Sequence, residues 1–140
     1  MSSGAAIAAA AVFTWLGMVV AISFIEAPLK FRAPGVTLPI GLGIGRLVFR
    51  ALNAAEGTLA VVIVAALCES PISVAIAAVS VAIGALVLQL VAVRPRLTRR
   101  SDAVLAGSDT PRSDAHHAYV GLEVIKVIAL IAAGVAVLSR

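Results

Sequence analysis

The sequence predicts an all-α membrane protein, a single domain that crosses the bilayer as an antiparallel bundle of four helices. The chain of 140 residues is 61% hydrophobic and 13% charged, whereas soluble domains are about half apolar and about a quarter charged. The apolar residues also gather in runs of about 20 residues, which is enough to span the hydrocarbon core. The predicted transmembrane helices cover residues 5–25, 44–67, 72–92 and 117–138.

The first predicted span, residues 5–25, is almost entirely apolar. Trp15 lies near its middle rather than at a membrane boundary, so its indole N–H needs a partner inside the protein. Two interpretations of Trp15 stay open, namely packing against another helix and lining a binding pocket. No Lys or Arg precedes the run, so we expect a retained helix rather than a cleaved secretory signal.

The segment between the first two spans, residues 26–43, is rich in residues that disfavour helix. These residues are Pro28, Pro34, Pro39, Gly35, Gly41 and Gly43. We therefore expect a loop here, with residues 33–43 lying in the membrane interface or re-entering the membrane against protein. Gly41 and Gly45 are about one helical turn apart, a spacing that permits close helix packing.

The third predicted span, residues 72–92, is apolar apart from a few small or polar residues. Its small residues recur every three or four positions, at Ser73, Ala77, Ser80 and Gly84. This stripe predicts a tight helix–helix contact, either within the chain or between subunits. Residues 93–115 are strongly charged and predict a polar loop that ends in a helix cap at Ser113 or Asp114. Cys68 is alone in the sequence, which excludes an internal disulfide.

The distribution of charge predicts the orientation in the membrane. The net charge is +4, and nine of the eleven Lys and Arg residues lie in or beside the loops 26–43 and 93–115. With four spans these loops share one side, and the positive-inside rule places them in the cytoplasm with both termini outside. We therefore expect a multi-pass protein of the bacterial inner membrane, embedded in the lipid bilayer. Stacking aromatic residues are missing from the basic segments, which argues against nucleic acid as a partner.

The predicted functional site is a network of charges inside the membrane. A helix turns by about 100° per residue, which places the polar residues of the second span on one side. These residues are Arg46, Arg50, Asn53 and Glu56. In the fourth span a similar stripe holds Tyr119, Glu123 and Lys126, with His116 at its border. Ionisable groups at membrane depth are costly and need partners or water, so both stripes should face the bundle interior.

The charges of the two spans are complementary at similar depth. We expect Arg50 to pair with Glu123. We also expect Glu56 to pair with Lys126, since a rise of about 1.5 Å per residue brings both pairs within side-chain reach. Three interpretations stay open: the pairs only fix helix register, they form a proton or ion relay or a polar binding site centred on Glu56, or the two helices do not touch. The side chains expected to line an adjoining pocket are Trp15, Tyr119 and His116.

The two histidines do not predict a metal or cofactor site. His116 and His117 are adjacent and point about 100° apart on a helix, so they seldom bind one ion together. No Cys, His or carboxylate lies at metal-ligand spacing from them. We therefore predict neither a metal site nor a cofactor. The sequence also lacks a hydrolase triad or an HExxH motif, so no catalytic residue is assigned.

Part of the sequence resembles a known family. The residues concerned are Trp15 and Gly17 in the first span, and Pro28, Gly45, Arg46, Phe49 and Asn53 to Glu56 within the run from Phe24 to Gly57. They resemble a family of small bacterial four-helix membrane proteins of unknown function. That family is distantly similar to a eukaryotic four-helix transmembrane protein linked to platinum-drug resistance. The resemblance implies a membrane protein connected with export or stress tolerance.

Three functions are consistent with these observations. The leading hypothesis is a small transporter-like or accessory component in which Glu56 responds to a proton or cation. Lys126 and Arg50 would then be its electrostatic partners and Glu123 the counter-charge. The second hypothesis is a structural or assembly subunit, either of a homo-oligomer or of a larger membrane complex. The third and weakest is a haem-linked membrane enzyme that uses His116 or His117.

Overall fold

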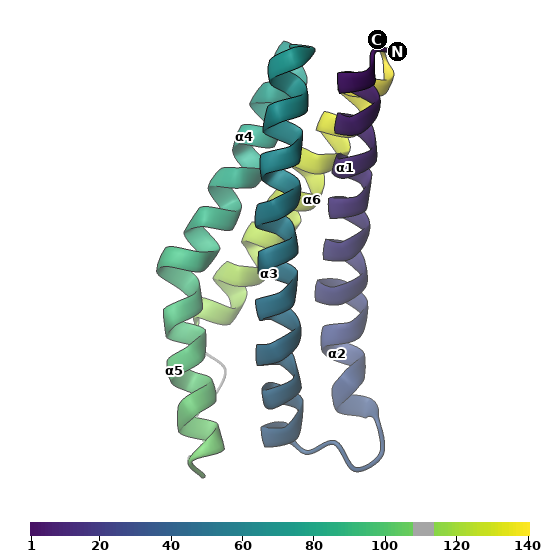
Figure 1. Ribbon diagram of the computed structural model, residues 1–140. Coiled ribbons are helices and arrows are strands. Elements are labelled where there is room, and N and C mark those ends of the chain that lie inside the picture. Colours follow the sequence, from purple (N-terminus) through teal and green to yellow (C-terminus); the bar gives the residue numbers. More distant parts are fainter. Residues whose placement is uncertain (108–113) are drawn as a thin grey trace.

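The computed structural model describes residues 1–107 and 114–140, and in these ranges it contains helices but no strand. The predicted all-α class is confirmed. Within the described ranges, four helical runs are long and apolar enough to cross a membrane. These runs are Ser3–Arg32, Leu38–Glu69, Ser73–Leu105 and Asp114–Leu138. Each predicted span lies inside one of them, except that the predicted third span begins one residue earlier, at Ile72. Figure 1 shows the runs side by side with alternating direction, so both termini lie at one end of the bundle.

The two ends of the bundle differ, and we name its halves accordingly. The terminal half holds both chain termini and the turn at residues 70–72, where the Ser2 hydroxyl lies 2.7 Å from that of Ser70. The basic half holds the connection 33–37 and the charged helix α5 (Arg94–Leu105) (Figure 1). Residues 108–113, which include the predicted cap Ser113, lie outside the described residues.

The first helical run continues beyond its predicted end. It comprises α1 (Ser3–Val19), the π-helical segment η1 (Val20–Glu26), α2 (Ala27–Leu29) and the short 3-10 helix η2 (Lys30–Arg32). Pro28 follows the wide turns of η1, where its missing N–H and its ring are tolerated better than inside a regular α-helix. The expectation of a loop from residue 26 onward is therefore wrong for residues 26–32. The true connection is residues 33–37, where Gly35 adopts a φ of +82°.

The second run is a single helix, α3 (Leu38–Glu69), which begins earlier than predicted. Thr37 caps it by accepting a hydrogen bond from the Ile40 amide, and Pro39 lies in its first turn, where proline is well tolerated. Residues 38–43 are thus ordinary helical turns, and the expected re-entrant segment at 33–43 is not formed.

Gly41 and Gly45 lie at a close contact, but side chains rather than a neighbouring helix backbone fill the space beside them. Both glycines are buried on α3. A Cβ at Gly41 would collide with the Phe31 ring, and one at Gly45 would lie 2.9 Å from the Lys30 ammonium. The missing side chains on α3 therefore make room for two side chains that come from η2.

The third run also continues as helix into its predicted loop. It comprises α4 (Ser73–Leu88), the π-helical segment η3 (Gln89–Val93) and α5 (Arg94–Leu105). The expectation of a loop from residue 93 is wrong for residues 94–105. Pro95 follows the wide turns of η3, where its missing N–H and its ring are tolerated better than inside a regular α-helix, and Arg and Leu are good helix formers. The run ends near Gly107, whose φ is +94°.

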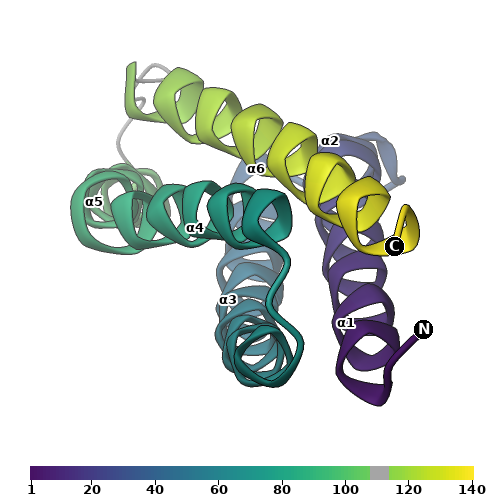
Figure 2. The same ribbon diagram turned by 90° about the horizontal axis from the view of Figure 1, so that it is seen from above.

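Helix α6 (Asp114–Leu138) crosses the bundle obliquely (Figure 2) and packs against α4 and α1, while α1 also packs against α3. The apolar core of the terminal half is built from small and aliphatic side chains. Members that are fully buried include Ala8, Val12, Ile63, Ala75, Leu130 and Val137. The stripe Ser73, Ala77, Ser80 and Gly84 is exposed instead, so packing within the chain uses another face of α4.

The outer surface is apolar while the interior holds charges, the reverse of a soluble protein. Leu47, Val61 and Val91 are each at least 70% exposed. Glu56, Glu123 and Lys126, in contrast, are at most 1% exposed. This distribution fits a multi-pass membrane protein, since lipid favours the apolar surface.

Candidate functional site: a buried charge network beside a basic pocket

The centre of the site is the ammonium group of Lys126, which lies between two carboxylates. Its Nζ atom is 2.6 Å from Oε2 of Glu56 and 2.6 Å from Oε1 of Glu123. The pair between Glu56 and Lys126, which the sequence predicts, therefore forms and joins α3 to α6. The pair between Glu123 and Lys126 lies within α6, one helical turn apart.

Three neutral donors also form hydrogen bonds with the two carboxylates. The Trp15 indole Nε1 donates to Oε2 of Glu56 at 2.7 Å. The Gln89 amide Nε2 donates to Oε1 of Glu123 at 2.7 Å. The Ser23 hydroxyl donates to Oε2 of Glu123 at 2.5 Å. Every one of the four membrane-span-like runs thus contributes at least one residue. We call this set the charge network: Trp15, Ser23, Glu56, Gln89, Glu123 and Lys126.

The two π-helical segments deliver the donors that sequence reasoning missed. Ser23 lies in η1 and Gln89 is the first residue of η3. Wide turns of this kind occur frequently at functional sites, and here the side chains of both residues reach Glu123. Gln89 is the one amide side chain in a predicted span that is otherwise apolar or small. This is the only feature of the sequence that distinguishes it.

Three of the predicted network residues lie elsewhere. Arg50 is exposed, so the expected pair with Glu123 is wrong. Arg46 pairs instead with Asp102 of α5 at 2.8 Å, which joins α3 to α5 outside the network. Asn53 is half-buried, and its Oδ1 atom has no hydrogen-bond partner among the described residues.

Glu56 uses only one of its oxygens. Its Oε2 accepts from both Trp15 and Lys126, while its Oε1 is buried without a hydrogen-bond partner in the described part of the chain. A carboxylate can bind a proton on either oxygen, and the protonated form becomes a donor. The Oε1 atom of Glu56 therefore offers a place for an added proton that leaves both existing hydrogen bonds intact.

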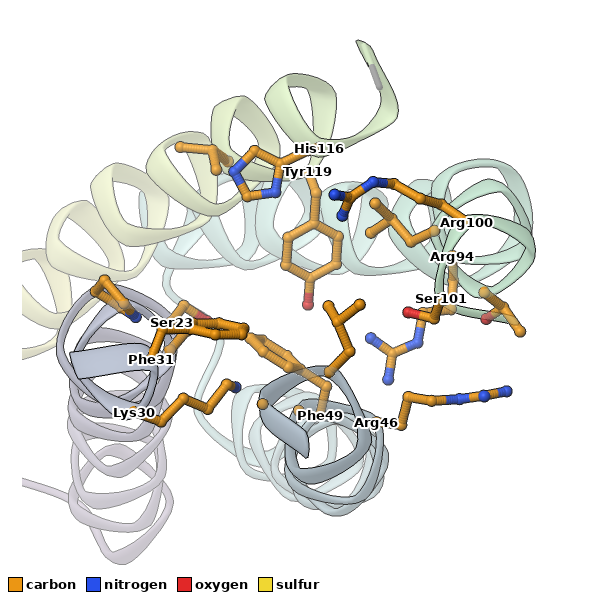
Figure 3. Close-up of a pocket in the computed structure, with 18 of the residues that line it drawn as sticks. Ser23, Lys30, Phe31, Arg46, Phe49, Arg94, Arg100, Ser101, His116 and Tyr119 are labelled. Atoms are coloured by element: carbon orange, nitrogen blue, oxygen red, sulfur yellow. The ribbon is translucent and has the colours of Figure 1, made fainter. Parts of the chain in front are cut away.

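A pocket of about 710 Å³ adjoins the network in the basic half (Figure 3). Ser23 and Glu123 belong to both, so the pocket reaches the network. Among the described residues, four Lys and Arg side chains line it, namely Lys30, Arg46, Arg94 and Arg100. Of the residues predicted to line a pocket, Tyr119 and His116 do so. Trp15 does not, because it is fully buried against Glu56.

Aromatic rings hold two of the cations at the pocket wall. The Phe49 ring packs edge-to-face on Tyr119, with 5.7 Å between centroids. The Lys30 ammonium lies 5.7 Å from the Phe49 centroid, and the Arg94 guanidinium lies 5.6 Å from it. Cation–π attraction of this kind positions both cations without neutralising their charge.

Among the described residues, no group of three or more His, Cys, Asp or Glu side chains is placed to hold a metal ion. The rings of His116 and His117 pack edge-to-face at 5.7 Å, and only His116 lines the pocket.

Comparisons with models of protein families, with curated proteins and with solved structures found no match to this chain. The resemblance carried by Phe24 to Gly57 therefore stays a prediction.

Proposed function

We propose that the protein is a small transporter-like component of the bacterial inner membrane, in which the charge network takes up and releases a proton. The observation that carries this proposal is the position of Lys126, buried and 2.6 Å from two carboxylates. The basic half would face the cytoplasm and both termini would lie outside. The concentration of Lys and Arg around the pocket supports that orientation under the positive-inside rule.

The balance of charge distinguishes a proton-binding network from a structural one. With all three groups ionised, the two carboxylates exceed the single ammonium by one negative charge. A network that served only to fix helix register would need no surplus carboxylate, since one Glu and one Lys would be enough. One added proton makes the network neutral, and uncompensated charge at membrane depth is costly. The surplus carboxylate therefore favours a site that exchanges a proton.

The residues around the charge network determine from which side of the bundle a proton can reach it. Glu123 lines the pocket, and hydrogen bonds continue from it through Lys126 and Glu56 to Trp15. Toward the terminal half the apolar core is closed, with Val12 and Ile63 fully buried. In this conformation the exchange path leads through the pocket. Release to the other side would require the helices to move, as in alternating access.

The single tryptophan of the chain provides the experiment. Because Trp15 donates to Glu56, its fluorescence should respond when Glu56 gains or loses a proton. We expect a reversible change in emission between about pH 4 and about pH 9 for purified protein in lipid nanodiscs. Glu56→Gln should abolish the change, whereas Glu69→Gln, at the exposed end of α3, should retain it. Emission that is independent of pH in the folded wild-type protein would exclude the proposed proton exchange.

A structural or assembly subunit is the second candidate, and one observation favours it. The small-residue stripe on α4, Ser73, Ala77, Ser80 and Gly84, is exposed rather than used within the chain. A face of this kind permits close approach of a helix from another subunit. If this is the main role, Ser80→Leu should disrupt an assembly seen by native mass spectrometry, while Glu56→Gln should leave that assembly intact.

A further inference from the structure

The basic pocket contains features that proton exchange does not use, and the first is its excess of positive charge. Its basic side chains are Lys30, Arg46, Arg94 and Arg100, and the only carboxylate lining it among the described residues is Glu123. Arg46 is paired with Asp102, which does not line the pocket. Glu123 is already bound to Lys126, Gln89 and Ser23. Cations held in a partly enclosed apolar site create a field that attracts anions.

The second feature is a buried donor that points into the pocket. Tyr119 is 7% exposed, and its hydroxyl oxygen is buried without a hydrogen-bond partner among the described residues. Figure 3 shows this hydroxyl directed into the space between Phe49 and the cations. Buried polar groups nearly always have a partner, so an unpaired donor aimed into a cavity indicates where an acceptor would bind.

The third feature is the convergence of Lys30 and Arg94. Both cations lie within 6 Å of the Phe49 centroid, at 5.7 and 5.6 Å, and Phe49 in turn packs on Tyr119. Lys30 comes from η2, Arg94 from α5 and Tyr119 from α6, so three helical runs point one group each toward the same space. The nearest acid to Lys30 is Glu26, at 3.7 Å, which is longer than a hydrogen bond.

The fourth feature is the apolar character of the remaining wall. Phe24, Phe31, Leu38 and Val120 line the pocket, and each is at least 38% exposed. These residues lie toward the ends of membrane-span-like runs. In a bilayer, the ends of such runs lie where lipid headgroups meet acyl chains. A volume of about 710 Å³ is in the range of pockets for organic ligands and exceeds the need of a small inorganic ion.

From these features we infer that the pocket binds the phosphate group of an anionic phospholipid, with its acyl chains against the apolar wall. Arg94 and Lys30 neutralise the phosphate, and the Tyr119 hydroxyl donates to one of its oxygens. Arg is well suited to phosphate because it offers several donors in a fixed planar arrangement. The inference goes beyond the proposed function, since Lys30, Arg94 and Tyr119 are not members of the charge network. A soluble phosphate ester shares the headgroup chemistry but would leave the apolar wall without an occupant.

The test measures lipid binding by native mass spectrometry of the delipidated full chain. Phosphatidylglycerol is added in competition with phosphatidylcholine, which has a phosphate but no net charge. Lys30→Gln with Arg94→Gln should weaken phosphatidylglycerol binding about tenfold, and Tyr119→Phe about threefold. The matched control is Arg32→Gln with Arg96→Gln, which removes the same charge from η2 and α5 at exposed positions outside the pocket. It should change binding less than about twofold.

The outcomes separate the alternatives. Equal losses in the pocket variant and in the control would show that only general surface charge attracts the lipid, which would overturn the inference. Displacement of phosphatidylglycerol by glycerol phosphate at equal concentration would overturn the lipid assignment in favour of a soluble phosphate ester. If the double pocket variant fails to fold, Tyr119→Phe, which removes a single oxygen, decides the question. Its binding should fall while its Trp15 emission still responds to pH.

Discussion

The two halves of the bundle are built from the same helical runs, but the terminal half is closely packed and apolar, whereas the basic half encloses a pocket. In the terminal half α1, α3, α4 and α6 are regular helices, and small residues such as Ala8 and Ala75 let them pack closely. In the basic half the first and third runs contain the π-helical segments η1 and η3, and the helices enclose a pocket. Regular turns thus accompany close apolar packing, and wide turns accompany the assembly of polar groups. The comparison predicts that each half fails through a different kind of substitution.

The largest expected effect is the loss of Lys126. Lys126→Met leaves Glu56 and Glu123 buried without their shared cation, and breaking a buried ion pair from one side costs about 3–5 kcal/mol. We expect little folded protein, measured by thermal unfolding in detergent. The control Arg140→Met removes an exposed cation and should unfold like the wild type. An unchanged unfolding temperature for Lys126→Met would show that the basic half does not depend on the network.

The terminal half should respond most to loss of volume. Leu130 is fully buried in its core, whereas the adjacent Ile131 is 47% exposed. We expect Leu130→Ala to destabilise the protein by about 2–4 kcal/mol, because it leaves a cavity in a closely packed region. Ile131→Ala should cost much less, since lipid fills the space that the side chain leaves. Equal costs for the two substitutions, measured in the same unfolding assay, would contradict close packing in this half.

A smaller effect tests the link between wide turns and polar groups. Ser23 of η1 donates to Glu123, whereas Ser80 of α4 is exposed and donates to the carbonyl of Ile76 in its own helix. Ser23→Ala should cost about 1 kcal/mol, and Ser80→Ala about zero, since only Ser23 serves a buried acceptor. The same unfolding assay compares them. Matching values would mean that the position of Ser23 in η1 has no bearing on the network.

The smallest effect concerns the arginines of α3. Arg50→Gln should change stability by less than about 0.5 kcal/mol, because Arg50 is exposed. Arg46→Gln should cost about 0.5 kcal/mol, since its pair with Asp102 is partly exposed. Unfolding in parallel with the wild type measures both values. A large loss for Arg50→Gln would restore the pairing with Glu123 that the sequence predicts.

The sequence predicts the helices and the central ion pair for clear physical reasons. Long apolar runs have few alternatives to a membrane helix, and a charge within such a run must find a partner. Glu56 and Lys126 are charges of this kind, so their pairing could be inferred. The pairing of Arg50 failed because Arg50 lies about 120° around α3 from Glu56, which turns it to the outer face.

The helix continuations and the neutral donors to Glu123 could not be predicted, because they depend on local backbone geometry that composition does not reveal. Pro28 and Pro95 predict breaks, yet the π-helical segment before each lets the helix continue. The same segments carry two donors to Glu123, Ser23 in η1 and Gln89 in η3. Neutral polar residues near the end of a span are common, so neither residue could be distinguished in the sequence from one that faces lipid headgroups.

Infrared spectroscopy of the carboxyl groups tests the central claim most directly, because protonated carboxyl bands of buried and exposed groups differ in frequency. The account predicts that wild-type protein in nanodiscs loses a buried-carboxyl band as the pH rises from about 4 to about 9. Glu56→Gln should remove or shift this band, and Glu69→Gln should leave it in place. A wild-type spectrum without such a band, or an identical band in the double variant Glu56→Gln with Glu123→Gln, would contradict proton uptake by the charge network.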